Sequence, residues 1–471
     1  MRPKPKRNHS PAHQPNRVTR AHPPRPVVLP PEFEQVFALL DDIYGDVASA
    51  DLPLDAELWV SAFLGGLWQA AMQDDEDPEP SEAGLVDVLE QVATPRTQAV
   101  LCGLACVGSP GAAALAREAS ERLFRVGIRR PPWYGRSLQA VVFLEGWSVS
   151  DVFADSEQLV AAFKRGKDEY AFTVTVANNV QGSVVEVMIV DFEDLPEILA
   201  ELRAEVADAD GVLSLDRLDA AELRRRLEPP VLETVVGLDD EDEDGEEPLA
   251  AELIDQEFLK GDLADLEGVA NDGFTGLGEN DDEDGDEDDG FPDDGEDFAS
   301  LRYLLLSRLS VLPEPTVLPE GADLGFDLAG IPDLLSEFLA SPEAGELADQ
   351  AIVKEWAEVF IRLGAAEFAG EPPLYGPEKF DMLLNVLIPA QINAKKPHLE
   401  VLRPTAVAWA RWSTGRVGLG EEMTDYLLET LGDTFLDFED SYEDPGYALD
   451  RQLSGFTMQS KKSPERRGKN S

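Results

Sequence analysis

The chain has 471 residues, and its 94 Asp and Glu against 39 Lys and Arg give a formal net charge of −55. A chain of this length exceeds one ordinary hydrophobic core, so we expect several domains. The acidic balance argues against duplex nucleic acid as a direct partner of the folded part, because binding to a phosphate backbone draws on Lys and Arg. We therefore expect protein partners.

The charge is unevenly distributed along the chain. The first 30 residues contain seven Lys or Arg and no acid, and the last eleven contain five basic residues against Glu465. Between Asp239 and Phe298 there are 28 acids and one base, Lys260, which gives a net charge of −27. Stretches of such composition cannot bury enough apolar surface to offset the entropy of ordering. We expect disorder in a basic tail over residues 1–27, an acidic linker over 237–297 and a tail over 441–471.

The predicted elements begin with a helical domain over residues 28–130. Apolar residues recur at helical spacing from Phe33 onward, and Asp55 stands where an N-cap would start a further helix. The uncharged run over residues 97–116 has the length of a membrane span. The sequence GSPG at residues 108–111 interrupts it, which favours two packed core helices joined by a turn and no membrane association.

The pattern over residues 131–236 predicts a small α+β domain. The stretches AVVFLEGW, YAFTVTV and SVVEVMIVD are rich in β-branched and aromatic residues and predict strands, the last two joined as a hairpin. The stretch SEQLVAAFKRG from Ser156 predicts a helix before the hairpin. Helices are also expected over LPEILAELRAE and DAAELRRRLEPP. We expect an antiparallel hairpin sheet covered by helices on one face.

A second helical domain is predicted over residues 298–440. Later helices are expected to begin near Pro377, Arg403 and Glu421. Three apolar stripes at spacings of three and four residues mark the earlier helices. These stripes are Leu301, Leu304, Leu305 and Leu309; Leu334, Leu335, Phe338 and Leu339; and Ile352, Trp356, Phe360 and Leu363. The fold class is thus multidomain and mainly α, with a small α+β unit, a basic N-terminal tail and an acidic linker.

Several stretches stand in a distinctive order along residues 135–420, namely FLEGWSVSDVFADSEQLVAAF, the hairpin, LRYLLLSRLSVLPEP, LLSEFLASPEAGELAD and PLYGPEKFDMLLNVLIPAQI. In this order the chain resembles a group of uncharacterised actinobacterial proteins. Similar proteins end the first hairpin strand with Asp-His-Asn, where this chain has Ala177, Asn178 and Asn179, and carry a Trp where it has Val386. The group has no assigned activity, so the resemblance implies a domain order and no function.

The acidic linker contains two partial matches to a calcium-binding EF-hand loop, a pattern in which acids alternate and a Gly follows. The twelfth position of such a loop supplies a closing carboxylate, but Ala251 and Phe291 stand there. We therefore favour a solvated acidic tether over a metal site. The weak metal candidates are Asp240, Asp242 and Asp244 in the first match and Asn280, Asp282 and Asp284 in the second.

Other candidate chemistry is sparse. Cys102 and Cys106 lie one helical turn apart without a nearby His, which favours buried small side chains over zinc binding. His398 is the one His outside the N-terminal tail, and no G-x-S-x-G or phosphate-binding loop accompanies it. The pair Trp409 and Trp412, with Arg411 and Arg416 beside it, offers binding of an anion or a partner, but we favour core aromatics with Arg at the surface, which is the commoner arrangement. We expect no catalytic residue and no cofactor.

The leading hypothesis is a cytoplasmic, non-enzymatic interaction or scaffold protein. One alternative is an enzyme or small-ligand binder with a pocket between the α+β unit and the C-terminal helices, where domain junctions often place sites. Another is an acidic nucleic-acid mimic in which the linker occupies the groove of a basic partner. The sequence names neither a substrate nor an oligomeric state.

Overall fold

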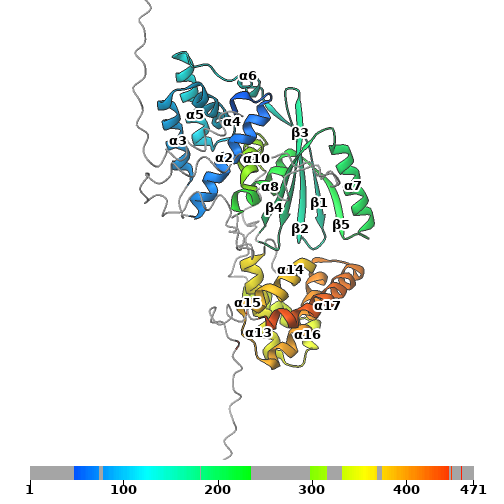
Figure 1. Cartoon of the computed structure of the whole chain (residues 1–471). Coiled ribbons are helices and arrows are strands. Elements are labelled where there is room, and N and C mark those ends of the chain that lie inside the picture. Colours follow the sequence, from blue (N-terminus) through cyan, green and yellow to red (C-terminus); the bar gives the residue numbers. More distant parts are fainter. Residues whose placement is uncertain are drawn as a thin grey trace, which may run out of the picture.

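A computed structural model of the chain describes residues 47–73, 78–180, 182–234, 298–315, 331–368 and 374–444, with residues 447 and 458. Within them the chain is mostly helical, with one antiparallel sheet. The elements form two bodies, drawn one above the other in Figure 1. The first body contains residues 47–234 and 298–315, and the second contains residues 331–444.

From residue 53 onward, four consecutive helices of the first body each start at a proline. The fixed φ of Pro suits the first helical position, where its missing N–H costs nothing. Thr94 adds a capping box, in which its side chain and that of Thr97 each bind the other's backbone N–H. The uncharged run folds as two helices joined at the Gly108–Pro110 turn, as predicted. The helices are α2 (Pro53–Gln73), α3 (Pro78–Val92), α4 (Pro95–Val107) and α5 (Pro110–Arg125), followed by the short α6 (Tyr134–Ser137).

The sheet has five antiparallel strands in the order β4-β3-β2-β1-β5. Four of them form a meander, and β5 returns to pair with β1 on the far side. We predicted the strands that became β1, β3 and β4, but not β5, which is only six residues long and whose polar residues are exposed. The strands are β1 (Val141–Asp151), β2 (Ser156–Arg165), β3 (Asp168–Ala177), β4 (Ser183–Asp191) and β5 (Leu213–Leu218).

The stretch from Ser156, for which we predicted a helix, is the central strand β2. Its five residues from Leu159 to Phe163 are all buried. Leu159, Ala161 and Phe163 belong to the core on one face of the sheet, whereas Val160 and Ala162 belong to the core on the other. A strand covered on both faces loses its polar alternation, so its apolar run cannot be told from a short helix by periodicity.

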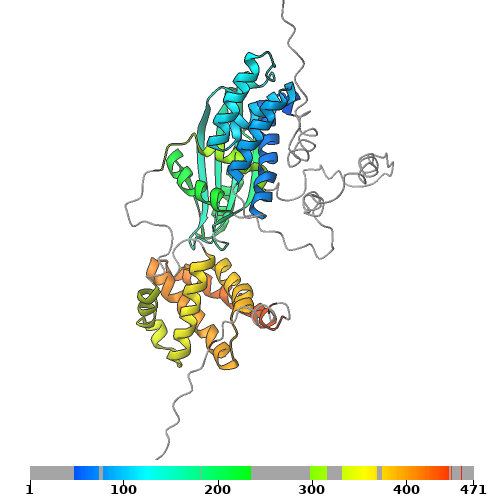
Figure 2. The same ribbon diagram turned by 90° about the vertical axis from the view of Figure 1, so that its left-hand side faces the viewer.

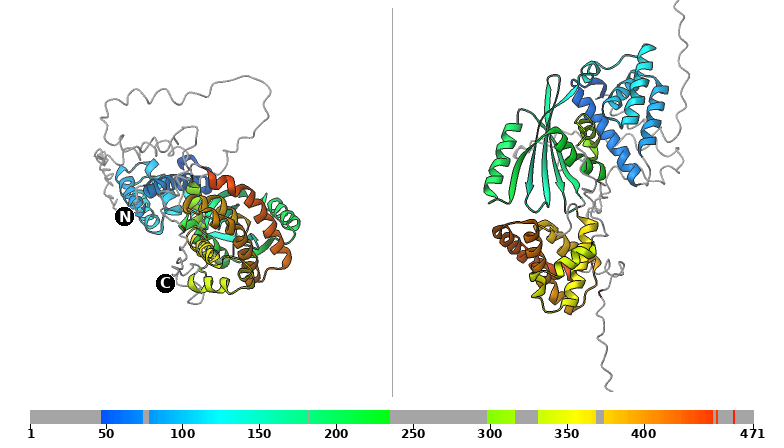
Figure 3. Two further views of the ribbon diagram at one scale, coloured as in Figure 1. Left: turned by 90° about the horizontal axis from the view of Figure 1, so that it is seen from below. Right: turned by 180° about the vertical axis from the view of Figure 1, so that it is seen from behind.

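Helices cover both faces of the sheet, not one face as predicted. Helix α7 (Leu195–Asp208) closes one face, and α8 (Ala220–Glu233) packs on the other with the N-terminal helices. Figure 3 shows α7 and the N-terminal helices on opposite sides of the sheet. The N-terminal helices and the face of the sheet that α8 covers share one continuous core, so the two domains that we predicted on either side of residue 130 are packed as one body.

Helix α10 (Phe298–Leu309) follows the acidic linker in sequence but lies in the first body, against α2. We predicted that residue 298 begins the second helical domain. The predicted leucine stripe of α10 is buried, but it faces α2 and the sheet. The division between the two bodies therefore falls after α10, within residues 316–330, which lie outside the described residues.

The second body is a set of helices around its own core, which contains Trp356, Phe360 and Trp409. Figure 2 shows it below the sheet and the N-terminal helices. Its longest helices, α16 and α17, are joined through Gly418, whose φ of +80° suits a residue without Cβ. The elements are α11 (Ile331–Leu339), α12 (Pro342–Gly345), α13 (Gln350–Glu367), α14 (Pro377–Asp381), a π-helical turn (Met382–Leu387), α15 (Ile388–Gln391), α16 (Lys396–Val417) and α17 (Glu421–Glu443).

Two adjacent glycines of α2 provide a test of how α10 packs. A Cβ at Gly65 would lie 1.9 Å from the carbonyl oxygen of Ala299, whereas a Cβ at Gly66 would meet no atom within 4 Å. Gly65→Ala should lower the free energy of unfolding by about 1–3 kcal/mol through overpacking. Gly66→Ala should raise it by up to about 1 kcal/mol, because Ala favours the helix. Denaturant unfolding of both variants measures this, and equal effects would contradict the close approach of α2 and α10.

Candidate functional site

A buried carboxylate, Glu57 of α2, joins three parts of the first body. One oxygen accepts a hydrogen bond from Arg165 at the end of β2, and the other accepts one from Arg308 of α10. The Nε of Arg308 donates to the hydroxyl oxygen of Tyr170 at 2.5 Å. The side chains of Glu57, Arg165 and Arg308 are only 0%, 8% and 1% exposed. We call these three residues the Glu57 cluster.

The electrostatics of the Glu57 cluster keep it charged. Burial raises the pKa of Glu57, but the positive charges of Arg308 and Arg165 outweigh it, so the pKa is lowered overall. Removing one member of such a buried group typically costs about 3–5 kcal/mol, because it leaves an uncompensated charge. Both carboxylate oxygens already have partners. The cluster therefore holds α2, β2 and α10 together and offers no free carboxylate oxygen for catalysis.

A second buried carboxylate, Asp155, lies where the β1–β2 turn meets the second body. Its Oδ1 accepts from the backbone N–H of Gly376 at 3.1 Å, and its Oδ2 accepts from that of Glu378 at 2.9 Å. Lys379 Nζ donates to the carbonyl oxygen of Ala154 at 2.7 Å and lies 3.8 Å from Asp155 Oδ1. Asp155 thus binds two backbone N–H groups at the start of α14, as an N-cap side chain does.

The β1–β2 turn is shaped by its own sequence, DVFADS. The Asp151 carboxylate accepts three backbone hydrogen bonds, from Phe153 at 2.7 Å and from Asp155 and Ser156 at 2.9 Å. The ring of Phe153 then stacks on Tyr426 of α17, with 6.2 Å between centroids. Such local bonds from Asp fix a turn. They position Asp155 and Phe153 for contact with the second body.

Burial dominates the electrostatics of this joint. It raises the pKa of Asp155 to about 7, against the opposing charge of Lys379. Burial also lowers the pKa of Lys379 and raises that of Glu378. One alternative from the sequence places a ligand pocket between the α+β unit and the C-terminal helices. At Asp155 the protein's own N–H groups already bind the carboxylate, so this part of the joint is a contact between the two bodies.

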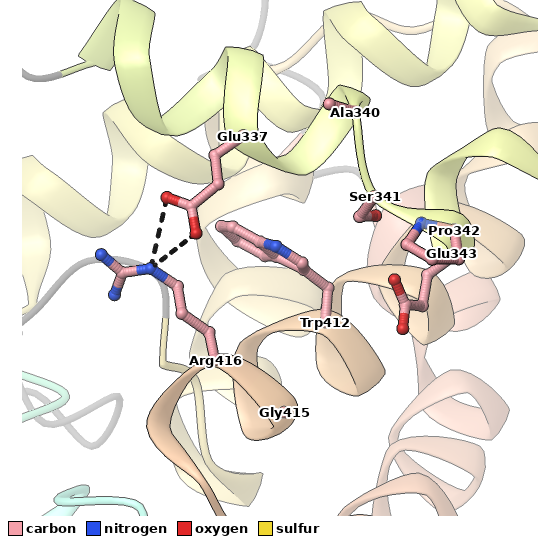
Figure 4. A pocket seen from close by; sticks show the side chains of 8 residues that line it. All are labelled: Glu337, Ala340, Ser341, Pro342, Glu343, Trp412, Gly415 and Arg416. Carbon is pink, nitrogen blue, oxygen red and sulfur yellow. Dashed lines mark hydrogen bonds and ion pairs between the residues drawn. The ribbon is translucent and has the colours of Figure 1, made fainter.

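An open hollow of about 550 Å³ lies on the second body, between the end of α11, α12 and the last turns of α16. Figure 4 shows Glu337 and Glu343 on opposite sides of the Trp412 indole. Arg416 Nε lies 3.3 Å and 3.4 Å from the two oxygens of Glu337. Trp412 is only 7% exposed and packs on Trp409 at a centroid distance of 4.9 Å. The hollow holds one surface ion pair and one further carboxylate, which do not form a positioned acid and base.

The Cys, His and metal candidates from the sequence lie apart from these features. Cys102 and Cys106 are free thiols on α4, and burial raises their pKa values to about 12 and about 11, so they are unreactive. His398 is buried on α16, with Nε2 3.3 Å from Glu355. Among the described residues, no group of three or more His, Cys, Asp or Glu could hold a metal ion. The metal candidates lie outside the described residues: Asp240, Asp242, Asp244, Asn280, Asp282 and Asp284.

Sequence reasoning missed the buried charges, although a signal was present. Glu57 stands on the same helical stripe as the buried Val60, Leu64 and Trp68. Arg308 continues the predicted leucine stripe of α10 at the same spacing. A charge within an apolar stripe indicates a buried, paired group, because a charged side chain is almost never fully buried alone. Asp155 and Lys379 carry no such signal, because Asp155 stands in a turn and Lys379 in the five-residue helix α14, which is too short to show an apolar stripe.

Comparison of the chain with protein-family models, with curated proteins and with solved structures gives no match. The resemblance to actinobacterial proteins stays a prediction. Among the described helices, none combines the length and the apolar character needed to cross a membrane. The function is therefore inferred from the geometry and the charge of the chain itself.

The raised pKa of Asp155 makes the stability of the joint depend on pH. A carboxyl whose pKa is about 7 in the folded chain, against 3.8 as its ordinary value, binds a proton more readily when folded. Its contribution to stability is therefore largest near pH 4 and is lost as the pH rises to 7. The raised pKa of Glu378 acts in the same direction. The lowered pKa of Glu57 changes the stability only below pH 4.5, the ordinary pKa of a glutamate.

We expect the wild-type protein to be less stable at pH 8 than at pH 5, with about 1–3 kcal/mol of the difference due to Asp155. Asp155→Asn removes the titrating group at nearly constant volume, so its unfolding free energy should vary less with pH. Asp433→Asn changes an exposed acid of α17 and should leave the variation unchanged. An identical pH dependence in the wild type and in Asp155→Asn would show that Asp155 does not titrate in this range.

Proposed function

We propose that this chain is a cytoplasmic, non-enzymatic interaction protein that presents residues 237–297, the acidic segment, to a basic protein partner. The observation that carries the proposal is that both ends of the segment are attached to the first body. Before it, the Thr234 hydroxyl accepts a hydrogen bond from the N–H of Val184 in β4 at 2.7 Å. After it, Phe298 and Ala299 are buried at the start of α10. The residues on both sides of the segment are thus fixed to the same body.

The charge of the segment sets the chemistry of the partner. It carries a net −27 of the chain's −55 within one eighth of its length. Binding of a basic partner would release counterions. The association would weaken with salt, because the Debye length falls to about 8 Å at physiological ionic strength. A nucleic-acid mimic is the narrower case, in which the partner's basic surface ordinarily holds a phosphate backbone.

The described residues give less support to an enzyme. The buried charges of the Glu57 cluster and of the joint are used in holding elements together, and the hollow beside Trp412 has an exposed ion pair. An active site needs titratable groups that converge on space for a substrate. None of these three places combines converging titratable groups with space for a substrate.

Co-purification from the native cell tests the proposal. Three baits are compared: the wild type, a variant of equal length with every Asp and Glu of the acidic segment changed to Asn or Gln, and a control. The control neutralises four exposed acids of α17, namely Glu429, Asp433, Asp437 and Asp440. The wild type and the control should retain the same basic protein, and the neutralised segment should lose it.

The recovered protein is then purified, and its affinity is measured at two salt concentrations. We expect binding that falls at least tenfold between 0.05 M and 0.5 M salt, as ion-pair release predicts. Recovery of one protein set by all three baits, or an affinity unaffected by salt, would refute an acidic docking segment.

A further inference from the structure

Residues 47–234 form a binding surface for a helix, and we propose that α10 occupies it as a docked ligand whose covalent link through residues 235–297 is dispensable. The proposal does not rest on the proposed function. The surface is a stripe of α2 with residues four apart, Glu57, Ser61 and Gly65, continued by Trp68. Positions at this spacing face one side of a helix.

Each position of this stripe meets a matching group of α10. Glu57 binds Arg308, and the hydroxyl oxygen of Ser61 accepts a hydrogen bond from the N–H of Leu304 at 3.0 Å. The hydrogen of Gly65 leaves room for the carbonyl oxygen of Ala299. The two helices are therefore antiparallel: Glu57 meets the last turn of α10, and Gly65 meets its first turn. This match fixes both the register and the orientation of α10.

Trp68 completes the match at the start of α10. Its ring lies edge-on to Phe298 at 6.2 Å, and the Arg302 guanidinium lies 4.3 Å from the ring centroid. The Tyr303 hydroxyl donates to the buried Glu82 of α3 at 2.9 Å. Ion pairing, cation–π contact and close backbone approach therefore all contribute to the same surface.

The covalent connections of α10 are long on both sides. From the sequence, 63 residues (235–297) separate it from the last described residue before it, and 21 (310–330) separate it from α11. Its position is therefore set by the contacts that it makes. The second body, by comparison, touches the first in the described residues through the β1–β2 turn and its surroundings, centred on Asp155 and Phe153.

Two cuts in the full chain separate the contribution of the covalent connections of α10 from that of its contacts. One protease recognition sequence is inserted after Gly268 and another after Gly321, each in residues that the structure does not describe. After cutting at both, size-exclusion chromatography under native conditions shows which of the three pieces elute together: 1–268, 269–321 and 322–471. We expect the piece that contains α10 to elute with residues 1–268.

Matched variants show whether the α2 stripe holds the piece. Gly65→Ala should weaken its retention at least tenfold, and Gly66→Ala, one residue away, should leave it unchanged. Elution of residues 269–321 apart from residues 1–268 in the otherwise unchanged cut chain would overturn the proposal. Retention that is equal in the two glycine variants would also overturn it, because the stripe would then not be the binding surface.

Discussion

The structure depends on one buried charge. Glu57 lies at 0% exposure in α2, and it is compatible with folding only because Arg165 and Arg308 reach it from β2 and from α10. These partners come from positions 108 and 251 residues away in the sequence. A hydrophobic core tolerates many arrangements of similar volume, but a buried carboxylate requires its own partners, so the cluster selects one way of assembling the first body.

The two bodies are joined by a different kind of contact. Within the first body, a continuous core runs from the N-terminal helices to the sheet and α10. At the joint, Asp155 binds backbone groups of α14, and one aromatic pair adds to it. A small polar contact of this kind favours relative motion of the bodies more than a large apolar one does. The first body, with its one continuous core, also holds the residues on both sides of the acidic segment.

Periodicity recovered most helices and three strands, because amphipathic elements display their buried face in the sequence. It failed at β2, whose Leu159–Phe163 run is buried on both faces and includes two alanines that suit a helix. It also assigned α10 to the wrong body, since a leucine stripe shows that a helix is buried but not against what. The partners of Glu57 and Asp155 follow from three-dimensional contacts, which no spacing rule contains.

Glu57 and Arg308 stabilise the first body as a pair, and a double-mutant cycle measures this most directly. Unfolding free energies of the wild type, Glu57→Gln, Arg308→Gln and the double variant give the coupling energy, and the exposed pair Glu90 and Arg122 serves as a control with weak coupling. We expect a coupling of about 2–4 kcal/mol for Glu57 and Arg308. Additive effects, within about 0.5 kcal/mol, would contradict the account.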